Sequence, residues 1–211
     1  MMVLQRRFWP LLALCVLAAL LILAFMPAEK TLGQVIKIVY LHGALSRAGM
    51  IGFVAAGVTG LAYLIGRRPA LARWTQGLLL SGWGFWVTHF VVSMPATRLT
   101  WGPWIAWGEP RVTMTLQLMG VGLVVIVVTR LLGDGRFTAV AALLLAAAVA
   151  MMAGRTGVIR HPLDPIGASP STLLRIVYLL LLIPVISSMV LVAGRLARER
   201  LSDSAVITER G

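Results

Sequence analysis

Charged residues are scarce in this chain of 211 residues, and acidic ones are the scarcest. Only 12% of the residues are charged, whereas a soluble domain carries about 25%. Hydrophobic residues make up 59%, and the mean hydropathy is +0.92. These values exclude a soluble enzyme and a nucleic-acid-binding domain. The net charge of +12, from 19 Lys and Arg against 7 Asp and Glu, therefore describes membrane topology rather than a polyanionic partner.

The sequence also has only one cysteine, Cys15, so it excludes an intramolecular disulfide and a cysteine metal cluster. Cys15 lies in an apolar segment, where we expect it to be buried and inert. The chain has no phosphate-binding glycine loop, no zinc motif and no pattern typical of a Ser-His-Asp arrangement. We therefore expect a protein that is not an enzyme.

Long apolar runs are abundant, and each is long enough to cross about 30 Å of hydrocarbon. They predict an all-α fold, a polytopic membrane bundle of six transmembrane helices that forms a single domain over 1–211. The expected helices cover residues 8–26, 42–65, 75–94, 112–132, 138–153 and 172–194. The fifth is rich in alanine, which favours close packing inside the bundle.

Basic residues predict the orientation of this bundle. They gather at both ends of the chain and in the short connections 66–74 and 130–137, whereas the longer loops 27–41, 95–111 and 154–171 hold few. Because positive residues stay inside, both termini are expected in the cytoplasm and the long loops outside. The sequence thus predicts an integral plasma-membrane protein of the bacterial inner membrane, in contact with lipid.

The middle long loop, residues 95–111, holds three of the seven tryptophans, and we call it the tryptophan loop. Trp101, Trp104 and Trp107 recur at every third position, which on an interfacial helix would form one aromatic face. Such a face is typical either of an aromatic belt at the headgroups or of a binding surface for a large flat apolar ligand. The glycines, prolines and charges around the indoles favour the second interpretation.

Two histidines flank this loop in the sequence, each at the outer end of a helix. His42 opens the second expected helix, and His161 precedes the last. Either is typical of a solvated side chain when taken alone. Two imidazoles beside an aromatic surface, however, indicate axial ligands for the iron of heme b. A segment before the first histidine, KIVYL at 37–41, recurs as RIVYL at 175–179, and we assign the repeat no function.

His89 lies five residues inside the outer end of the third expected helix. At that depth we expect it to have no imidazole partner, so it is either a structural hydrogen-bonding residue or an alternative heme ligand. Heme propionates need cations, and the outer loops and the second helix supply them. The candidate propionate and loop contacts are Arg47, Arg98, Glu109, Arg111 and Arg160.

The motif WGPWIAWGEPRVT at 101–113 resembles the tryptophan-rich WWD signature of the heme-handling proteins of cytochrome c biogenesis, the CcmC/CcmF/CcsA superfamily. The six-helix layout is most similar to its CcmC-like members. The segment KIVYLH at 37–42 is similar to the family's approach to its first ligand. The resemblance implies that His42 and His161 ligate heme and that the tryptophan loop carries the ring outside the membrane.

The resemblance also implies partners and a mode of action. The chain would hold heme at the outer membrane face and pass it to a periplasmic heme chaperone similar to CcmE. ABC transporter subunits similar to CcmA and CcmB, and a small helix similar to CcmD, would release the loaded chaperone. Two other functions compete with this one. One is a permease subunit without heme, and the other is a resident membrane b-type cytochrome that uses His89.

Overall fold

The computed structural model describes residues 7–155, 157, 166 and 169–208. Its helices are α2 (Phe8–Phe25), α3 (Ile36–Gly66), α4 (Pro69–Trp101), α5 (Pro110–Leu132), α6 (Gly135–Arg155) and α7 (Thr172–Thr208). All six are long and apolar enough to cross a membrane, the last of them over Thr172–Arg198. The predicted all-α fold with six transmembrane helices is confirmed.

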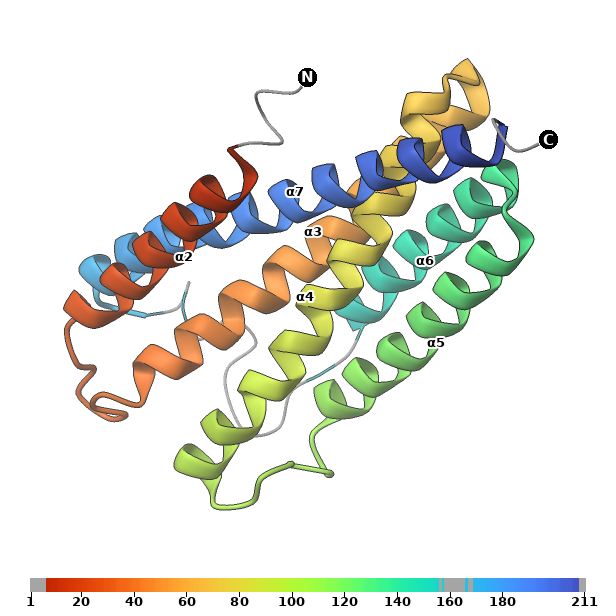
Figure 1. Ribbon diagram of the computed structural model, residues 1–211. Helices are drawn as coiled ribbons and strands as arrows, with labels where there is room; N and C mark the ends of the chain where they lie inside the picture. Colours follow the sequence, from red (N-terminus) through yellow and green to blue (C-terminus); the bar gives the residue numbers. More distant parts are fainter. Residues whose placement is uncertain (1–6, 156, 158–165, 167–168, 209–211) are drawn as a thin grey trace.

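Successive helices run in alternate directions, which gives the bundle two different ends (Figure 1). The short connections 67–68 and 133–134 lie at one end, here called the turn end. The start of α2 and the end of α7 point the same way, and the Arg195 guanidinium lies 5.3 Å from the centre of the Phe8 ring. The connection 26–35 and the loop 102–109 lie at the opposite end, here called the loop end.

Helix α3 is the centre of the bundle and packs against α4, α6 and α7. Small residues let it approach these neighbours closely. A Cβ added to Gly52 would lie 2.6 Å from the Cα of Gly82 on α4, and one added to Gly57 would lie 2.5 Å from the Cβ of Ala146 on α6. Lipid tails are as apolar as leucine, so helices in membranes associate largely through such backbone contacts.

Gly52→Ala is expected to destabilise the bundle by about 1–3 kcal/mol, because the new methyl group has no space against the α4 backbone. Gly84→Ala, on the same pair of helices, is the matched control, since a Cβ there meets nothing within 4 Å. The control should instead gain roughly 0.5–1 kcal/mol of helix propensity. Thermal unfolding of both variants in detergent checks the opposite signs. If Gly52→Ala and Gly84→Ala melt at the same temperature, the close approach of α3 to α4 at Gly52 is contradicted.

Helix α4 is longer than predicted and does not end at residue 94. The structure continues the helix through Pro95 to Trp101. Membrane helices tolerate proline in their interior. On either side of Pro95 a hydroxyl bonds the helix backbone: Ser93 donates to the Phe90 carbonyl at 2.6 Å and Thr100 donates to the Ala96 carbonyl at 2.8 Å. At about 1.5 Å per residue, a helix of 33 residues is longer than the hydrocarbon is thick.

Helix α3 also begins earlier than predicted, at Ile36 instead of residue 42. Lys37 explains part of this start, because its Nζ donates to the Ala24 carbonyl at 2.9 Å and so ties the first turn of α3 to the end of α2. The polar segment between these helices is a structured turn. Hydrogen bonds from the Leu32 and Thr31 backbone hold the pKa of Glu29 below its usual value.

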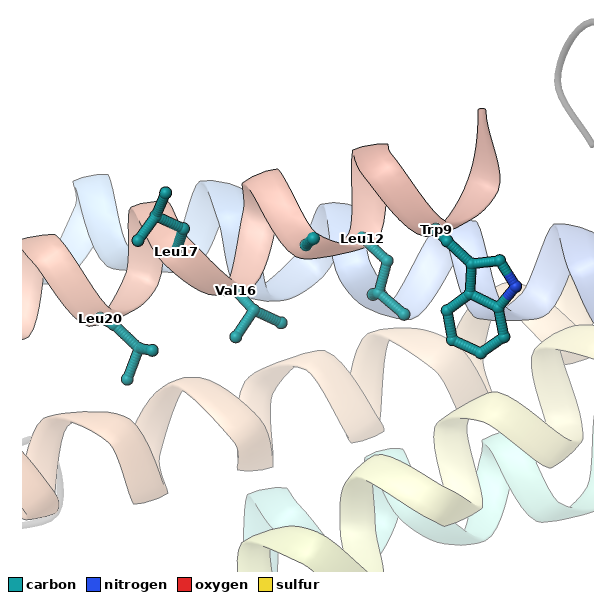
Figure 2. Close-up of a pocket in the computed structure, with 6 residues that line it drawn as sticks. Trp9, Leu12, Val16, Leu17 and Leu20 are labelled. Atoms are coloured by element: carbon teal, nitrogen blue, oxygen red, sulfur yellow. The ribbon is translucent and has the colours of Figure 1, made fainter. Parts of the chain in front are cut away.

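Helix α2 lies at the edge of the bundle and packs mainly against α7. Its remaining surface is apolar and exposed, and Figure 2 shows an open groove along it. The groove is lined by Trp9, Leu12, Ala13, Val16, Leu17 and Leu20. An exposed apolar face of this kind suits contact with lipid tails.

Candidate functional site

The structure brings two of the three histidines together, near the loop end. His42 on α3 and His89 on α4 stack with their ring centroids 4.4 Å apart and an angle of 28° between the rings. His89 is buried, and His42 is half-buried. The expectation that His89 has no imidazole partner at its depth was therefore wrong. It failed because α3 begins before His42 and α4 continues well past His89, which places both residues inside the helical bundle.

A third ring extends this pair into the core. The ring centroids of Trp86 and His89 lie 4.9 Å apart, and Trp86 is almost fully buried. Its Nε1 donates a hydrogen bond to the Thr115 carbonyl on α5 at 3.2 Å. The Phe53 and Trp86 rings pack edge to face, with their centroids 6.3 Å apart. We call His42, His89 and Trp86 the ring column, because together they connect α3, α4 and α5.

The ring column holds a buried nitrogen on His89 whose state calls for a chemical explanation. The Nδ1 atom of His89 is buried and has no hydrogen-bond partner. An unsatisfied buried nitrogen costs about 1–3 kcal/mol, so such atoms are uncommon in folded proteins. A cost of this kind is typical of a functional position rather than of simple packing.

The tryptophan loop is irregular where one aromatic face was expected. Trp101 is the last residue of α4, and residues 102–109 are not helical, since the chain turns at Gly102 with φ +95°. The expectation of an interfacial helix through the three indoles was therefore wrong. Trp104 and Trp107 are 57% and 69% exposed, and Trp101 is half-buried. Two large flat rings at the loop end thus stay accessible.

The second half of the loop is anchored in the protein. Ala106 and Glu109 are both buried, at 2% exposure each. The Glu109 backbone N–H donates to the Ala106 carbonyl at 2.8 Å, and the Glu109 carbonyl accepts from Val112 at 2.9 Å, where α5 begins. The buried residues alternate with exposed Trp104 and Trp107, so the loop holds its indoles outward from a fixed base.

Three of the predicted cations lie in the described part of the chain. Arg98 is exposed in the last turn of α4 and donates to the Gly102 carbonyl, which holds the turn into the loop. Arg111 lies in the first turn of α5, and its Nε is buried without a hydrogen-bond partner. Arg47 is exposed on α3 and lies well inside that helix. His161 and Arg160 lie outside the described residues.

The repeated segments KIVYL and RIVYL, to which we assigned no function, meet in the structure. The Tyr40 and Tyr178 rings pack edge to face at 5.3 Å, which joins α3 to α7. A Cβ on Gly43 would lie 3.3 Å from the Tyr178 hydroxyl oxygen, so α7 approaches α3 directly beside His42. The repeat was a usable signal for this contact. The Trp86 contact had a signal too, because Trp86 and His89 are three residues apart on one helix.

No family model and no curated protein matches this chain. The resemblance to the heme-handling superfamily therefore rests on the tryptophan loop, on His42 and on the six-helix layout.

The described residues fit heme in the kinds of groups they present. Heme iron takes only one or two protein ligands, and His42 is a half-buried imidazole near the loop end. Trp104 and Trp107 present exposed flat rings at that end, and Arg98 and Arg111 are cations suited to carboxylates. Among the described residues, no three His, Cys, Asp or Glu side chains gather to hold a bare metal ion.

Proposed function

We propose that this protein binds heme b at the loop end of the bundle and passes it to an acceptor outside the membrane. The observation that carries the proposal is the half-buried His42 imidazole, which lies near the loop end and is backed by the buried ring of His89. When bound, heme supplies an iron centre with two axial positions. The chain's own part is to hold and release that group, which is handling rather than catalysis.

The roles of the residues follow from their chemistry. In this proposal the His42 imidazole would hold the heme iron together with His161, as the resemblance implies. His89 would support the His42 ring rather than hold the iron, because the two imidazoles stack face to face. Trp101, Trp104 and Trp107 contact the ring. The arginines of the site, with Glu109 at the base of the loop, form its polar border.

The charges support an orientation for the integral membrane protein. Arginines crowd the turn end, in or next to its two connections: Arg67, Arg68, Arg73, Arg130 and Arg136. By the positive-inside rule this end lies in the cytoplasm, together with both termini. The tryptophan loop then lies on the periplasmic side of a bacterial inner membrane.

Exposure of the indoles supports transfer to a second protein. Trp104 and Trp107 are open to the outside, so an incoming acceptor can reach a ligand held against them. The acceptor proposed from the resemblance is a periplasmic heme chaperone similar to CcmE. ABC transporter subunits similar to CcmA and CcmB, and a helix similar to CcmD, are proposed to act with it.

Titration of the purified protein with hemin tests the function. One equivalent of hemin is expected to produce a Soret band and the visible bands of a low-spin, six-coordinate iron. Titration of a helical membrane protein without this site, in the same detergent, measures uptake of hemin by the micelle. If the protein takes up no more hemin than this control, the proposal is wrong and a permease subunit with an aromatic belt becomes the better interpretation.

A resident b-type cytochrome is a second candidate, and one observation favours it. His89 is a buried imidazole inside the helical bundle, where an internal heme would take its ligand. This candidate predicts that heme is lost when His89 is replaced and retained when His42 is replaced. The face-to-face stack on His42 weighs against it, because both rings would have to move before a porphyrin entered.

A further inference from the structure

The ring column is anchored at its inner end, which distinguishes it from an incidental stack. At the inner end, Trp86 is 1% exposed and hydrogen-bonded through Nε1 to the Thr115 carbonyl. At the outer end, His42 is half-buried and lies near the start of α3. His89 lies between them, in ring contact with both, at 4.4 Å and 4.9 Å.

We propose that His89 and Trp86 are positioning residues that fix the orientation of the His42 imidazole. This inference rests on the proposed function, in which His42 is a heme ligand. Outer contacts of this kind set the direction of a ligand's lone pair and commonly change metal affinity when they are removed. His89 acts through its ring stack on His42, with the two ring centroids 4.4 Å apart.

The helix contact beneath the column explains why the rings meet in this register. A Cβ on Gly49 would lie 3.0 Å from the Trp86 backbone nitrogen, so α3 and α4 touch through their backbones at this level. His42 lies two turns before Gly49 on α3, and His89 lies one turn after Trp86 on antiparallel α4. Both imidazoles therefore project from helices whose separation and register are already fixed.

The inner end of the column leads to the tryptophan loop. Thr115 lies one turn after Arg111 on α5, the helix that begins directly after the loop. The same indole therefore supports the candidate ligand on one side and the helix that carries the loop on the other. The column keeps His42 and the base of the loop in one rigid frame.

The experiment compares His89→Ala with His89→Phe. Alanine removes the stack, whereas phenylalanine restores a flat ring but offers no nitrogen to iron. In the protein without heme, diethyl pyrocarbonate modification of His42, followed by mass spectrometry, is expected to be several-fold faster in His89→Ala and close to wild type in His89→Phe. With hemin, His89→Ala is expected to bind about 10- to 100-fold more weakly and to gain high-spin character, and phenylalanine is expected to restore both.

Trp86→Phe and Trp83→Phe form the matched pair for the inner end. Trp83 Nε1 donates to the Met119 carbonyl at 3.0 Å, so both substitutions remove one indole hydrogen bond between α4 and α5. Only Trp86 contacts His89, however. Trp86→Phe is expected to accelerate His42 modification and to shift the Soret band, and Trp83→Phe to leave both unchanged. If Trp86→Phe fails to fold, the His89 pair decides the question alone.

Failure of the positioning role and failure of the proposed function would give different results. Equal rates of His42 modification in wild type, His89→Ala and Trp86→Phe would overturn the positioning role, even if hemin binds normally. Loss of heme in His89→Ala that phenylalanine does not restore, while His42→Ala retains heme, would instead make His89 the ligand itself. Failure of the wild type to bind hemin would overturn the proposed function, while the modification rates still decide whether the column positions His42.

Discussion

Purified protein carrying His42→Gly is expected to lose the low-spin heme spectrum, and millimolar imidazole is expected to restore it. Glycine removes the ligand and leaves a space that free imidazole fills, supported by the same His89 face. The loss of affinity should exceed the ~10–100-fold that changes in outer contacts cost, because an iron ligand itself is removed. Visible spectra of hemin-loaded protein, recorded with and without imidazole, measure the effect.

His89→Phe is the control for this variant, since it changes the neighbouring ring without removing the proposed ligand. It should keep the low-spin spectrum and also unfold at or above the wild-type temperature. The second effect follows because phenylalanine removes a buried nitrogen that has no hydrogen-bond partner. An unchanged spectrum in His42→Gly would place the ligand elsewhere and contradict the proposed site.

Replacing Trp104 and Trp107 together with alanine is expected to weaken hemin binding about 5- to 150-fold, which corresponds to ~1–3 kcal/mol. Each stacked aromatic ring contributes about 0.5–1.5 kcal/mol beyond the area that it buries. Both side chains are exposed, at 57% and 69%, so their removal should leave the bundle itself unchanged. Fluorescence quenching during hemin titration gives the affinities of the single and double variants.

Trp9→Ala separates a heme surface from an aromatic belt. Trp9 is 66% exposed, like the two loop indoles, but it begins α2 near the turn end. If the tryptophans only anchor the protein in lipid, substitutions at either end should change hemin binding to the same extent. The heme site instead predicts that Trp9→Ala binds hemin as wild type does. Equal weakening by all three tryptophan substitutions would contradict the role of the loop.

The number and type of helices could be predicted because their signal is spread over many residues. Each transmembrane run extends over a complete crossing, so one atypical residue does not hide it. The ends of the helices are harder to predict, because a single local contact can decide where a helix stops. Pro95 is a strong stop signal in the sequence, yet Ser93 and Thr100 make local hydrogen bonds that accompany the continued helix.

The histidine pair could not be predicted for the same reason. Whether His42 and His89 lie at one depth depends on where α3 begins and where α4 ends, and both ends differed from the prediction by about two turns. The candidate residues themselves were visible as scarce residue types in apolar surroundings. Their pairing required the register between two helices, which the Gly49 and Gly52 contacts with α4 set and no periodicity reveals.

The position of α2 at the edge of the bundle has a consequence for assembly order. A single membrane helix is stable before it packs, because its backbone hydrogen bonds are internal. Since α2 packs mainly against α7, it meets its partner only after the ribosome has made every helix between them. Until then lipid covers the face of α2 that later meets α7, just as it continues to cover the groove in Figure 2. The seam between α2 and α7 is therefore among the last in the bundle to close.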